Sequence, residues 1–247
     1  MMLNNKLKAI KSVFREKQEY DIRTSMEAYK IWAESYDYEK DNLILHYDEI
    51  IVNKMLEGIN LSGKTILDFG SGTGRNRNKL MKHIPGRIIG CDISPEMTSK
   101  LRSKFPEAET YLIRNEKLDF LQDKECDLII STLVISHIEN INTLTAEWNR
   151  VMKEYGDIII TDQHPEMFIK GGARTFKYDG NTYKVENFIH EINRIEEIFC
   201  KIGFRKLCLI EEIVDEKVKP FYIKKNALHI YERFQGVPFI YGLHLRR

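Results

Sequence analysis

The sequence has 247 residues, with 38 Lys and Arg against 37 Asp and Glu, which gives a formal net charge of +1. This length suits one large α/β domain with a small extension and is short for two independent domains. The balanced charge excludes a global field that would attract nucleic acid or an anionic membrane. The chain lacks a signal-peptide pattern and any apolar run of about 18 residues, so we expect a cytoplasmic protein without a membrane span.

Residues 1–60 are rich in Lys, Glu and Tyr and show helical spacing without strand signals. We therefore predict an N-terminal helical lid that packs on a core formed by residues 61–247. The four cysteines lie far apart and include no Cys-x-x-Cys pair, which indicates reduced thiols rather than a disulfide framework or a zinc site.

Short apolar runs alternate with helical patterns from Thr65 onward, which is typical of βαβ units and a parallel sheet. The runs are almost continuously apolar, as expected for strands that are covered on both faces. They are TILDF, RIIGCD, TYLIR, CDLIIS and DIIITD, starting at Thr65, Arg87, Thr110, Cys126 and Asp157. Two more strands, FRKLCLIEE and VPFIYGLHLRR, are expected near the end of the chain.

Helices are expected between these strands. Ser94-Pro95-Glu96 combines a capping serine, a proline for the first helical position and an acid in the first turn. Further helices are predicted over residues 73–83, 141–154 and 185–202, and Gly203 supplies the C-terminal cap of the last one.

Two polar and aromatic stretches, residues 164–186 and 214–235, fit neither pattern. Segments that follow strand ends cover the ligand crevice of an open α/β sheet. We therefore predict that these two insertions build an acceptor pocket.

The most informative segment is the loop from Asp68 to Asn76, with the sequence DFGSGTGRN, between the first strand and the next helix. Its glycines allow a sharp turn and a close approach of the backbone to a ligand. A dinucleotide-binding fingerprint would need a third glycine where this chain has Arg75, and a phosphate-binding P-loop would need Gly-Lys-Ser/Thr. The loop matches neither of these motifs.

An acid followed by Gly-x-Gly-x-Gly resembles the first motif of class I S-adenosylmethionine-dependent methyltransferases. The segment WAESYD, which begins at Trp32, resembles the lid helix of the ubiquinone/menaquinone and biotin biosynthesis methyltransferase type. The resemblance implies a Rossmann-like doubly wound α/β sheet of seven strands, mostly parallel with the last strand antiparallel. It also implies S-adenosylmethionine as the cofactor and S-adenosylhomocysteine as the product.

The same resemblance implies a set of cofactor-binding residues. Asp92 would accept hydrogen bonds from the ribose hydroxyls, Asn115 would contact the adenine, and Tyr36 of the lid would lie against the cofactor. The whole implied set is Tyr36, Asp68, Gly70, Ser71, Gly72, Thr73, Gly74, Asn76, Asp92, Ile93, Asn115, Ser131 and Leu133.

Catalytic residues are harder to assign. His164 and His190 are the candidate bases, since a histidine can take a proton from an acceptor atom near neutral pH. Asp162 and His164 could suggest a metal, but Ser131 stands where a metal-binding acid is expected, so no metal is predicted.

The function expected from the sequence is methyl transfer by in-line displacement to a small-molecule acceptor, in a monomer or homodimer that does not bind nucleic acid. A peptide, protein or RNA acceptor is an alternative, and so is a cofactor-binding protein without catalytic activity. The sequence does not distinguish a carbon, nitrogen or oxygen acceptor.

Overall fold

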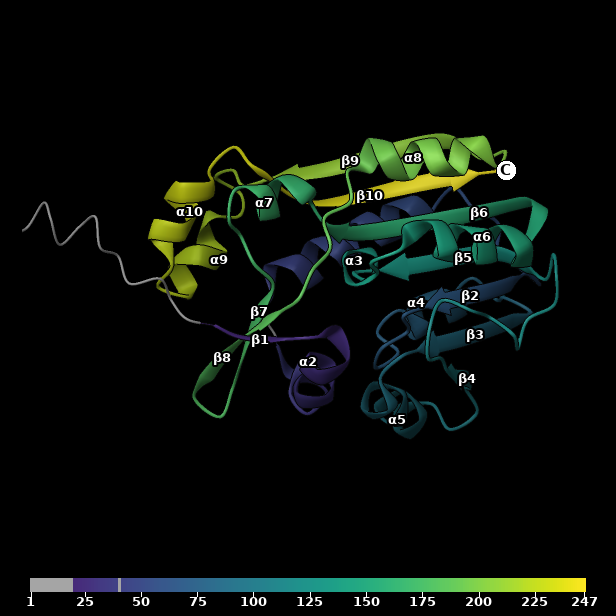
Figure 1. Ribbon diagram of the computed structural model, residues 1–247, viewed down its shortest axis with the longest axis horizontal. Coiled ribbons are helices and arrows are strands. Elements are labelled where there is room, and N and C mark those ends of the chain that lie inside the picture. The colour runs from purple at the N-terminus through teal and green to yellow at the C-terminus, as the bar shows by residue number, and fades with distance from the viewer. Residues whose placement is uncertain (1–19, 40) are drawn as a thin grey trace, which may run out of the picture.

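A seven-stranded sheet runs through the centre of the molecule in the computed structural model, which describes residues 20–39 and 41–247 (Figure 1). The strands, in their order across the sheet, are β4 (Glu109–Leu112), β3 (Arg87–Asp92), β2 (Thr65–Phe69), β5 (Cys126–Thr132), β6 (Met152–Gln163), β10 (Pro238–Arg246) and β9 (Arg205–Ile213). β10 is antiparallel to β6 and to β9, and the other pairs in this sheet are parallel. The predicted fold class is therefore confirmed.

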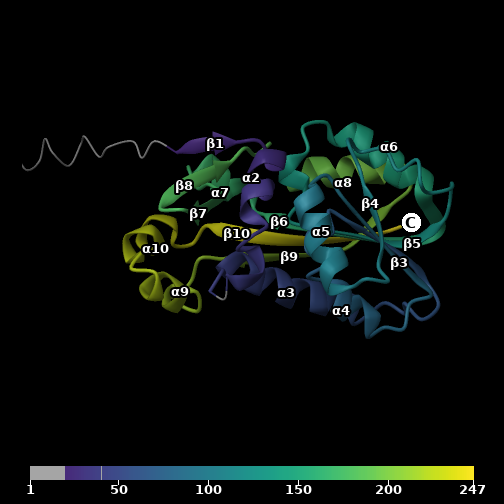
Figure 2. The same cartoon turned by 90° about the horizontal axis from the view of Figure 1, so that it is seen from below.

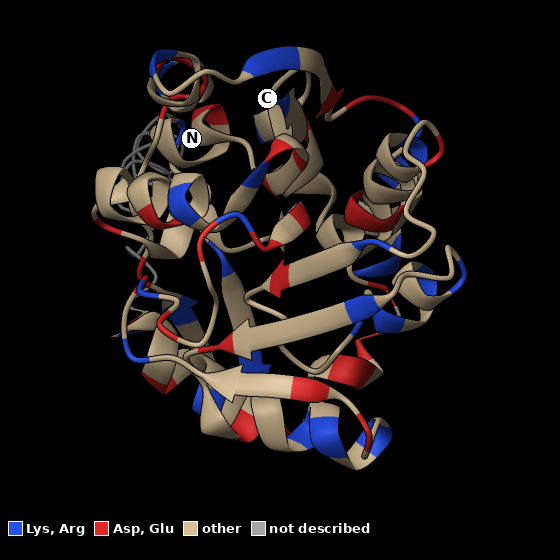
Figure 3. Ribbon diagram, turned by 90° about the vertical axis from the view of Figure 1, so that its right-hand side faces the viewer, with Lys and Arg blue, Asp and Glu red and all other residues tan. Residues whose placement is uncertain are grey.

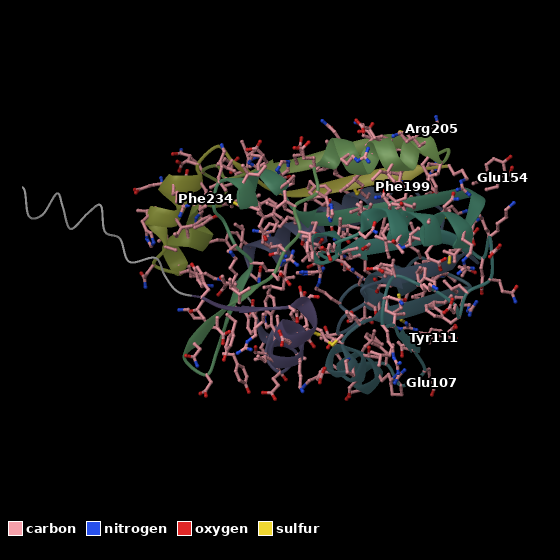
Figure 4. The ribbon with its side chains drawn as sticks, viewed as in Figure 1. Glu107, Tyr111, Glu154, Phe199, Arg205 and Phe234 are labelled. Atoms are coloured by element: carbon pink, nitrogen blue, oxygen red, sulfur yellow. The ribbon has the colours of Figure 1, made fainter. Side chains whose placement is uncertain are left out.

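Helices cover both faces of the sheet (Figure 2). One face packs against α6 (Ile141–Val151) and α8 (Ile192–Lys201), and the other against α3 (Leu43–Leu56) and α4 (Arg77–Met81). Successive side chains of a strand point to opposite faces, so neighbouring residues Ile66 and Leu67 belong to different cores. Phe199 is completely buried between α8 and the strands (Figure 4).

The helix caps predicted at Ser94 and Gly203 are confirmed. The Ser94 hydroxyl accepts a hydrogen bond of 3.2 Å from the Met97 N–H at the start of α5 (Pro95–Lys104). Gly203 follows α8 with φ of +93°, a conformation that favours glycine.

Three predicted helix boundaries are wrong, each for a local reason. α4 begins at Arg77 instead of residue 73, because the preceding loop contains Gly74 at φ +82°. α6 ends at Val151, since Met152 already pairs with β5. α8 begins at Ile192 because the chain before it is held by the Phe188 N–H, which donates to the Ser136 carbonyl.

A second, three-stranded sheet lies at one end of the molecule, in the order β1 (Asp21–Arg23), β8 (Asn181–Val185), β7 (Thr175–Tyr178). The prediction that the N-terminal region lacks strands is therefore wrong, because β1 gains a parallel partner from a distant insertion. Helix α2 (Ser25–Trp32) and the 3-10 turn η1 (Tyr36–Tyr38) follow β1. The first 19 residues of the predicted lid lie outside the described residues.

Both predicted insertions contain regular structure. The first includes α7 (Pro165–Ile169), β7 and β8, and the second includes α9 (Lys219–Lys224) and α10 (Leu228–Phe234). They gather with β1 and α2 at the same end of the molecule (Figures 1 and 2). Across residues 20–39 and 41–247, no helix combines the length and apolar character needed to cross a bilayer.

Candidate functional site

The glycine loop between β2 and α4 turns so sharply that glycine is required at its first position. Gly70 has φ of +73°, and a Cβ added there would lie 2.2 Å from Cγ2 of Val134. The N–H of Gly70 donates to the Cys91 carbonyl at 2.8 Å, which fixes the loop to the end of β3. The loop is thus held between the ends of β3 and β5.

Gly72, at the centre of the loop, differs from Gly70 because the protein leaves space beside it. A Cβ added at Gly72 would meet only the Gly70 carbonyl oxygen, at 4.0 Å. Its φ of +53° still favours glycine. The chain therefore forms a turn whose outer side is open to a ligand.

Asp92 closes β3 and faces this loop. Its Oδ2 accepts from the Gly72 N–H at 2.7 Å, and its Oδ1 accepts from the Ser94 N–H at 2.8 Å. Burial raises the pKa of Asp92, while these backbone donors oppose the rise. Each carboxylate oxygen retains accepting capacity, so Asp92 can also receive hydroxyl groups of a ligand.

Two buried polar atoms at neighbouring strand ends have no hydrogen-bond partner. They are Oδ1 of Asp68 on β2 and Oγ of Ser131 on β5. Burial raises the pKa of Asp68 to about 7. Since buried polar groups are normally hydrogen-bonded, these two atoms indicate a polar ligand beside the loop.

Ion pairs and hydrogen bonds to α3 and to the end of β5 anchor the loop. Asp48 on α3 is fully buried and pairs with Arg75, and it also accepts from the Thr161 hydroxyl. Asn76 donates to the Thr132 hydroxyl at 2.9 Å. Arg75, which replaces the third glycine of the dinucleotide fingerprint, therefore links the loop to α3.

The segment formed by α2 and η1, called the lid from here on, contacts the same loop. Asp37 in η1 accepts a hydrogen bond of 2.6 Å from the Thr73 hydroxyl and pairs with Lys104 on α5 at 2.9 Å. Tyr36 beside it packs edge-on against Trp32, with ring centroids 5.2 Å apart. The lid thus contacts the glycine loop directly.

A cavity of about 330 Å³ lies next to this assembly. Its wall includes Tyr36 from the lid and Leu133 from the end of β5. Both insertions contribute as well, with Met167 from the first and Phe234 from the second. Figure 4 labels Phe234 at the end of the molecule opposite Glu154. Residues of both insertions therefore line the same cavity.

The polar end of the cavity is organised by Arg174, which is 8% exposed. Its guanidinium donates to Asp162 Oδ1 at 2.8 Å, to the Leu133 carbonyl at 2.9 Å and to the Tyr29 hydroxyl at 3.2 Å. Leu133 has φ of +61°, an unusual conformation for a residue with a side chain. Arg174 therefore joins the first insertion to a strained strand end and to the lid.

Comparison with known proteins agrees with this geometry. The family described as "Methyltransferase domain" matches residues 67–160, from β2 to β6, and so includes the glycine loop and Asp92. Residues 67–160 of this chain therefore form a methyltransferase domain.

Two relatives show how far the sequence similarity extends. A Haemophilus influenzae protein is 27% identical over 180 residues, which cover 65% of this chain and 69% of the relative. A protein named as a methyltransferase in Bacillus cytotoxicus is 29% identical over 141 residues, which cover 53% of this chain and 63% of the relative. This chain thus matches only about two thirds of the length of each of these relatives.

Two solved structures share the methyltransferase fold. The S-adenosylmethionine-dependent methyltransferase of Mesorhizobium loti has a TM-score of 0.60 at 16% identity, covering 79% of this chain and 96% of its own. DhpI in complex with S-adenosylhomocysteine has a TM-score of 0.60 at 16% identity, covering 90% and 94%. S-adenosylmethionine is the cofactor of this type of methyltransferase.

The structure places most of the expected cofactor residues of this methyltransferase domain together. The loop residues lie beside Asp92 and Ile93, Ser131 lies on the neighbouring strand β5, and Leu133 directly follows the end of that strand. Asn115 lies in an exposed turn after β4, where its side chain accepts from the Lys117 N–H at 3.0 Å.

The two histidines expected as bases do not line the large cavity. His164 caps α7, where its Nδ1 accepts from the Glu166 N–H, and its Nε2 lies 2.8 Å from Glu211. His190 lies 2.6 Å from the Ile138 carbonyl. Both rings therefore contact groups of the protein that hold the local fold.

Sequence reasoning missed Arg174, Asp48 and Gln163. Arg174 and Asp48 are charged residues that are buried through contacts with distant segments. Gln163 is the last residue of β6, so its place at a strand end was the one available signal. The structure describes no group of three or more His, Cys, Asp or Glu side chains that could hold a metal ion between Tyr20 and Arg247, Lys40 aside.

Proposed function

We propose that this methyltransferase acts on a small molecule that binds in the cavity beside the glycine loop. The observation that carries the proposal is that the lid and both insertions line this one cavity, with Tyr36 on its wall next to Asp37, which contacts the glycine loop. A volume of about 330 Å³ is within the usual range for small-molecule sites.

The residues present fit S-adenosylmethionine. The open side of Gly72 and the unpartnered oxygens of Asp68 and Ser131 are features that such a ligand would complete. Asp92 would take the ribose hydroxyls, and Tyr36 would cover the cofactor from the lid. Asn115 is retained as the proposed adenine contact. When bound, S-adenosylmethionine supplies an activated methyl group on a sulfonium, which an acceptor lone pair can displace in line.

The protein contributes mainly position and exclusion of water. The hydrogen bond that the Thr73 hydroxyl donates to Asp37 holds the lid against the loop, and the wall of the cavity orients the acceptor. Holding two reactants in line can lower a barrier by up to about 7 to 11 kcal/mol. A general base is needed only where the acceptor must lose a proton, and His164 and His190 are not placed for that role.

A small acceptor is favoured over RNA by the distribution of charge. The 38 Lys and Arg of the chain are nearly balanced by 37 Asp and Glu, and Figure 3, which faces the end of the molecule opposite the cavity, shows basic and acidic segments interspersed there. Recognition of RNA would favour a broad basic surface around the cavity. The volume of the cavity likewise suits a small molecule better than a folded protein.

The test is transfer of a labelled methyl group from S-adenosylmethionine to a cell extract separated into small molecules, proteins and RNA. We expect label in the small-molecule fraction. Ala173→Trp, which fills the cavity, should abolish transfer and leave binding of S-adenosylhomocysteine unchanged. Label in protein or RNA would contradict the small-molecule acceptor. Cofactor binding without transfer to any fraction would indicate a cofactor-binding protein without catalytic activity.

A further inference from the structure

Glu39 brings a carboxylate to the wall of the cavity. It directly follows η1 of the lid, and Trp32 and Asn42 line the cavity with it. Oε1 of Glu39 accepts a hydrogen bond of 2.6 Å from Nε1 of Trp32, and its Oε2 accepts one of 2.8 Å from Nδ2 of Asn42. These two contacts place the three side chains in one continuous patch of the wall.

Both neighbours of Glu39 are themselves fixed. The ring of Trp32 is 5% exposed and stacks on Phe176 of the first insertion, with centroids 4.7 Å apart. Oδ1 of Asn42 caps α3 by accepting a hydrogen bond of 3.2 Å from the Leu45 N–H. The carboxylate of Glu39 is therefore held in a defined position on the wall.

The charge of Glu39 has no opposite charge beside it. Its two partners are neutral donors, and no Lys, Arg or His in residues 20–39 and 41–247 forms an ion pair with it. Each oxygen of a carboxylate can accept more than one hydrogen bond, so both oxygens of Glu39 retain accepting capacity. A carboxylate with only neutral donors around it attracts a cation.

The other charged side chains on this wall are paired or exposed. Asp41 pairs with Lys224 at 2.7 Å. Arg174 pairs with Asp162 at 2.8 Å. Lys225 is exposed at the end of α9, where water weakens its interactions. The fixed charge that a ligand would meet on this wall is therefore negative.

Aromatic rings adjoin the carboxylate of Glu39. Tyr36 and Tyr29 line the cavity, and their ring centroids lie 5.2 Å and 5.5 Å from that of Trp32. The face of an aromatic ring attracts an organic cation. A carboxylate beside aromatic rings is thus the combination expected of a site for an organic ammonium group.

We propose that the acceptor of this methyltransferase carries a cationic nitrogen, and that Glu39 binds this group and so positions the acceptor in the cavity. The cationic nitrogen is not the methylated atom, because a protonated or quaternary nitrogen has no lone pair with which to displace a methyl group. This inference rests on the proposed function, since it assigns a substrate class to the same cavity. It makes Glu39 a substrate-binding residue.

The test compares benzyltrimethylammonium with its neutral carbon analogue neopentylbenzene and with the anion phenylacetate. Dissociation constants are measured by equilibrium dialysis on the full chain saturated with S-adenosylhomocysteine. Hydrophobic transfer alone would favour neopentylbenzene. We expect benzyltrimethylammonium to bind most tightly of these probes. Glu39→Gln should weaken its binding about fivefold and leave the binding of neopentylbenzene the same.

Asp41→Asn is the matched control, because it removes the same charge from the same wall at a carboxylate that already pairs with Lys224. It should leave the preference for the cation unchanged. An equal loss of this preference in Asp41→Asn and Glu39→Gln would overturn the inference, since a general field would then explain it. Tightest binding of neopentylbenzene or phenylacetate, or binding of none of the probes, would overturn it as well.

The cofactor provides a separate readout. A loss of S-adenosylhomocysteine affinity in Glu39→Gln with the probe preference intact would also contradict the inference, since Glu39 would then serve the cofactor. Failure of wild-type protein to bind S-adenosylhomocysteine would instead refute the proposed function.

Discussion

Asp37 of the lid accepts a hydrogen bond of 2.6 Å from the hydroxyl of Thr73 in the glycine loop. This contact joins two segments that are distant in the sequence, and Lys104 on α5 pairs with the same carboxylate. We expect a ligand bound beside the loop to leave only after the hydrogen bond between Thr73 and Asp37 has broken.

Loss of the contact between Asp37 and Thr73 should therefore speed ligand release. We expect Asp37→Asn and Thr73→Val to raise the dissociation rate of S-adenosylhomocysteine several-fold, as measured by stopped-flow fluorescence. Asp21→Asn is the control, since Asp21 pairs only with Arg23 among the contacts seen at that position. Equal rates in all these variants would show that the lid does not limit release.

The two glycines of the loop should respond differently to alanine. Gly70→Ala places a Cβ against Val134 in a left-handed backbone, and we expect a loss of about 2 to 5 kcal/mol of unfolding free energy. The Cβ of Gly72→Ala meets open space, so the variant should lose only the cost of a left-handed backbone conformation, about 1 to 2 kcal/mol of unfolding free energy. Denaturant titration would measure both, and a larger loss at Gly72 would refute this account of the loop.

Asp68 should make stability depend on pH in a defined direction. Its pKa is raised from 3.8 to about 7 in the folded protein, so the folded state holds the proton more tightly than the unfolded state. The stabilisation that comes from the protonated Asp68 carboxyl is complete below pH 3.8, and it is lost as the pH rises toward 7. Asp68→Asn removes this loss, and its gain in melting temperature should be larger at pH 8 than at pH 4. An equal gain at both pH values would contradict the raised pKa.

The pair of Asp48 and Arg75 should be essential to the stability of the domain. Asp48→Ala leaves the partly buried guanidinium of Arg75 and the buried Thr161 hydroxyl without their partner, which should cost up to about 3 to 5 kcal/mol. Asp123→Ala, which breaks an exposed pair with Arg150, should cost less than about 1 kcal/mol. Denaturant titration of both variants is the measurement, and similar losses would contradict a structural role for Asp48.

Much of the fold follows from local sequence signals. The parallel strands are continuous apolar runs, and Ser94 and Gly203 mark helix ends by side-chain capping and by backbone conformation. The glycine loop was predictable because its glycines and Asp68 are close together in the chain. These features depend on neighbours within a few residues.

The remaining features depend on partners that the sequence does not identify. β1 is a strand only because β8 pairs with it, and Arg174 is buried only because Asp162, Leu133 and Tyr29 receive its hydrogens. His164 had the right residue type for a base, but its ring is used to cap α7. Long-range contacts of this kind cannot be read from one sequence.

The most direct test of the central claim is calorimetric titration of S-adenosylmethionine and S-adenosylhomocysteine into wild-type protein and into Gly72→Trp. The indole of the variant would fill the open side of the loop. We expect micromolar binding of both ligands to wild-type protein and none to a folded Gly72→Trp variant. Absence of binding to wild-type protein, or unchanged binding to the variant, would contradict the assignment of this loop as the cofactor site.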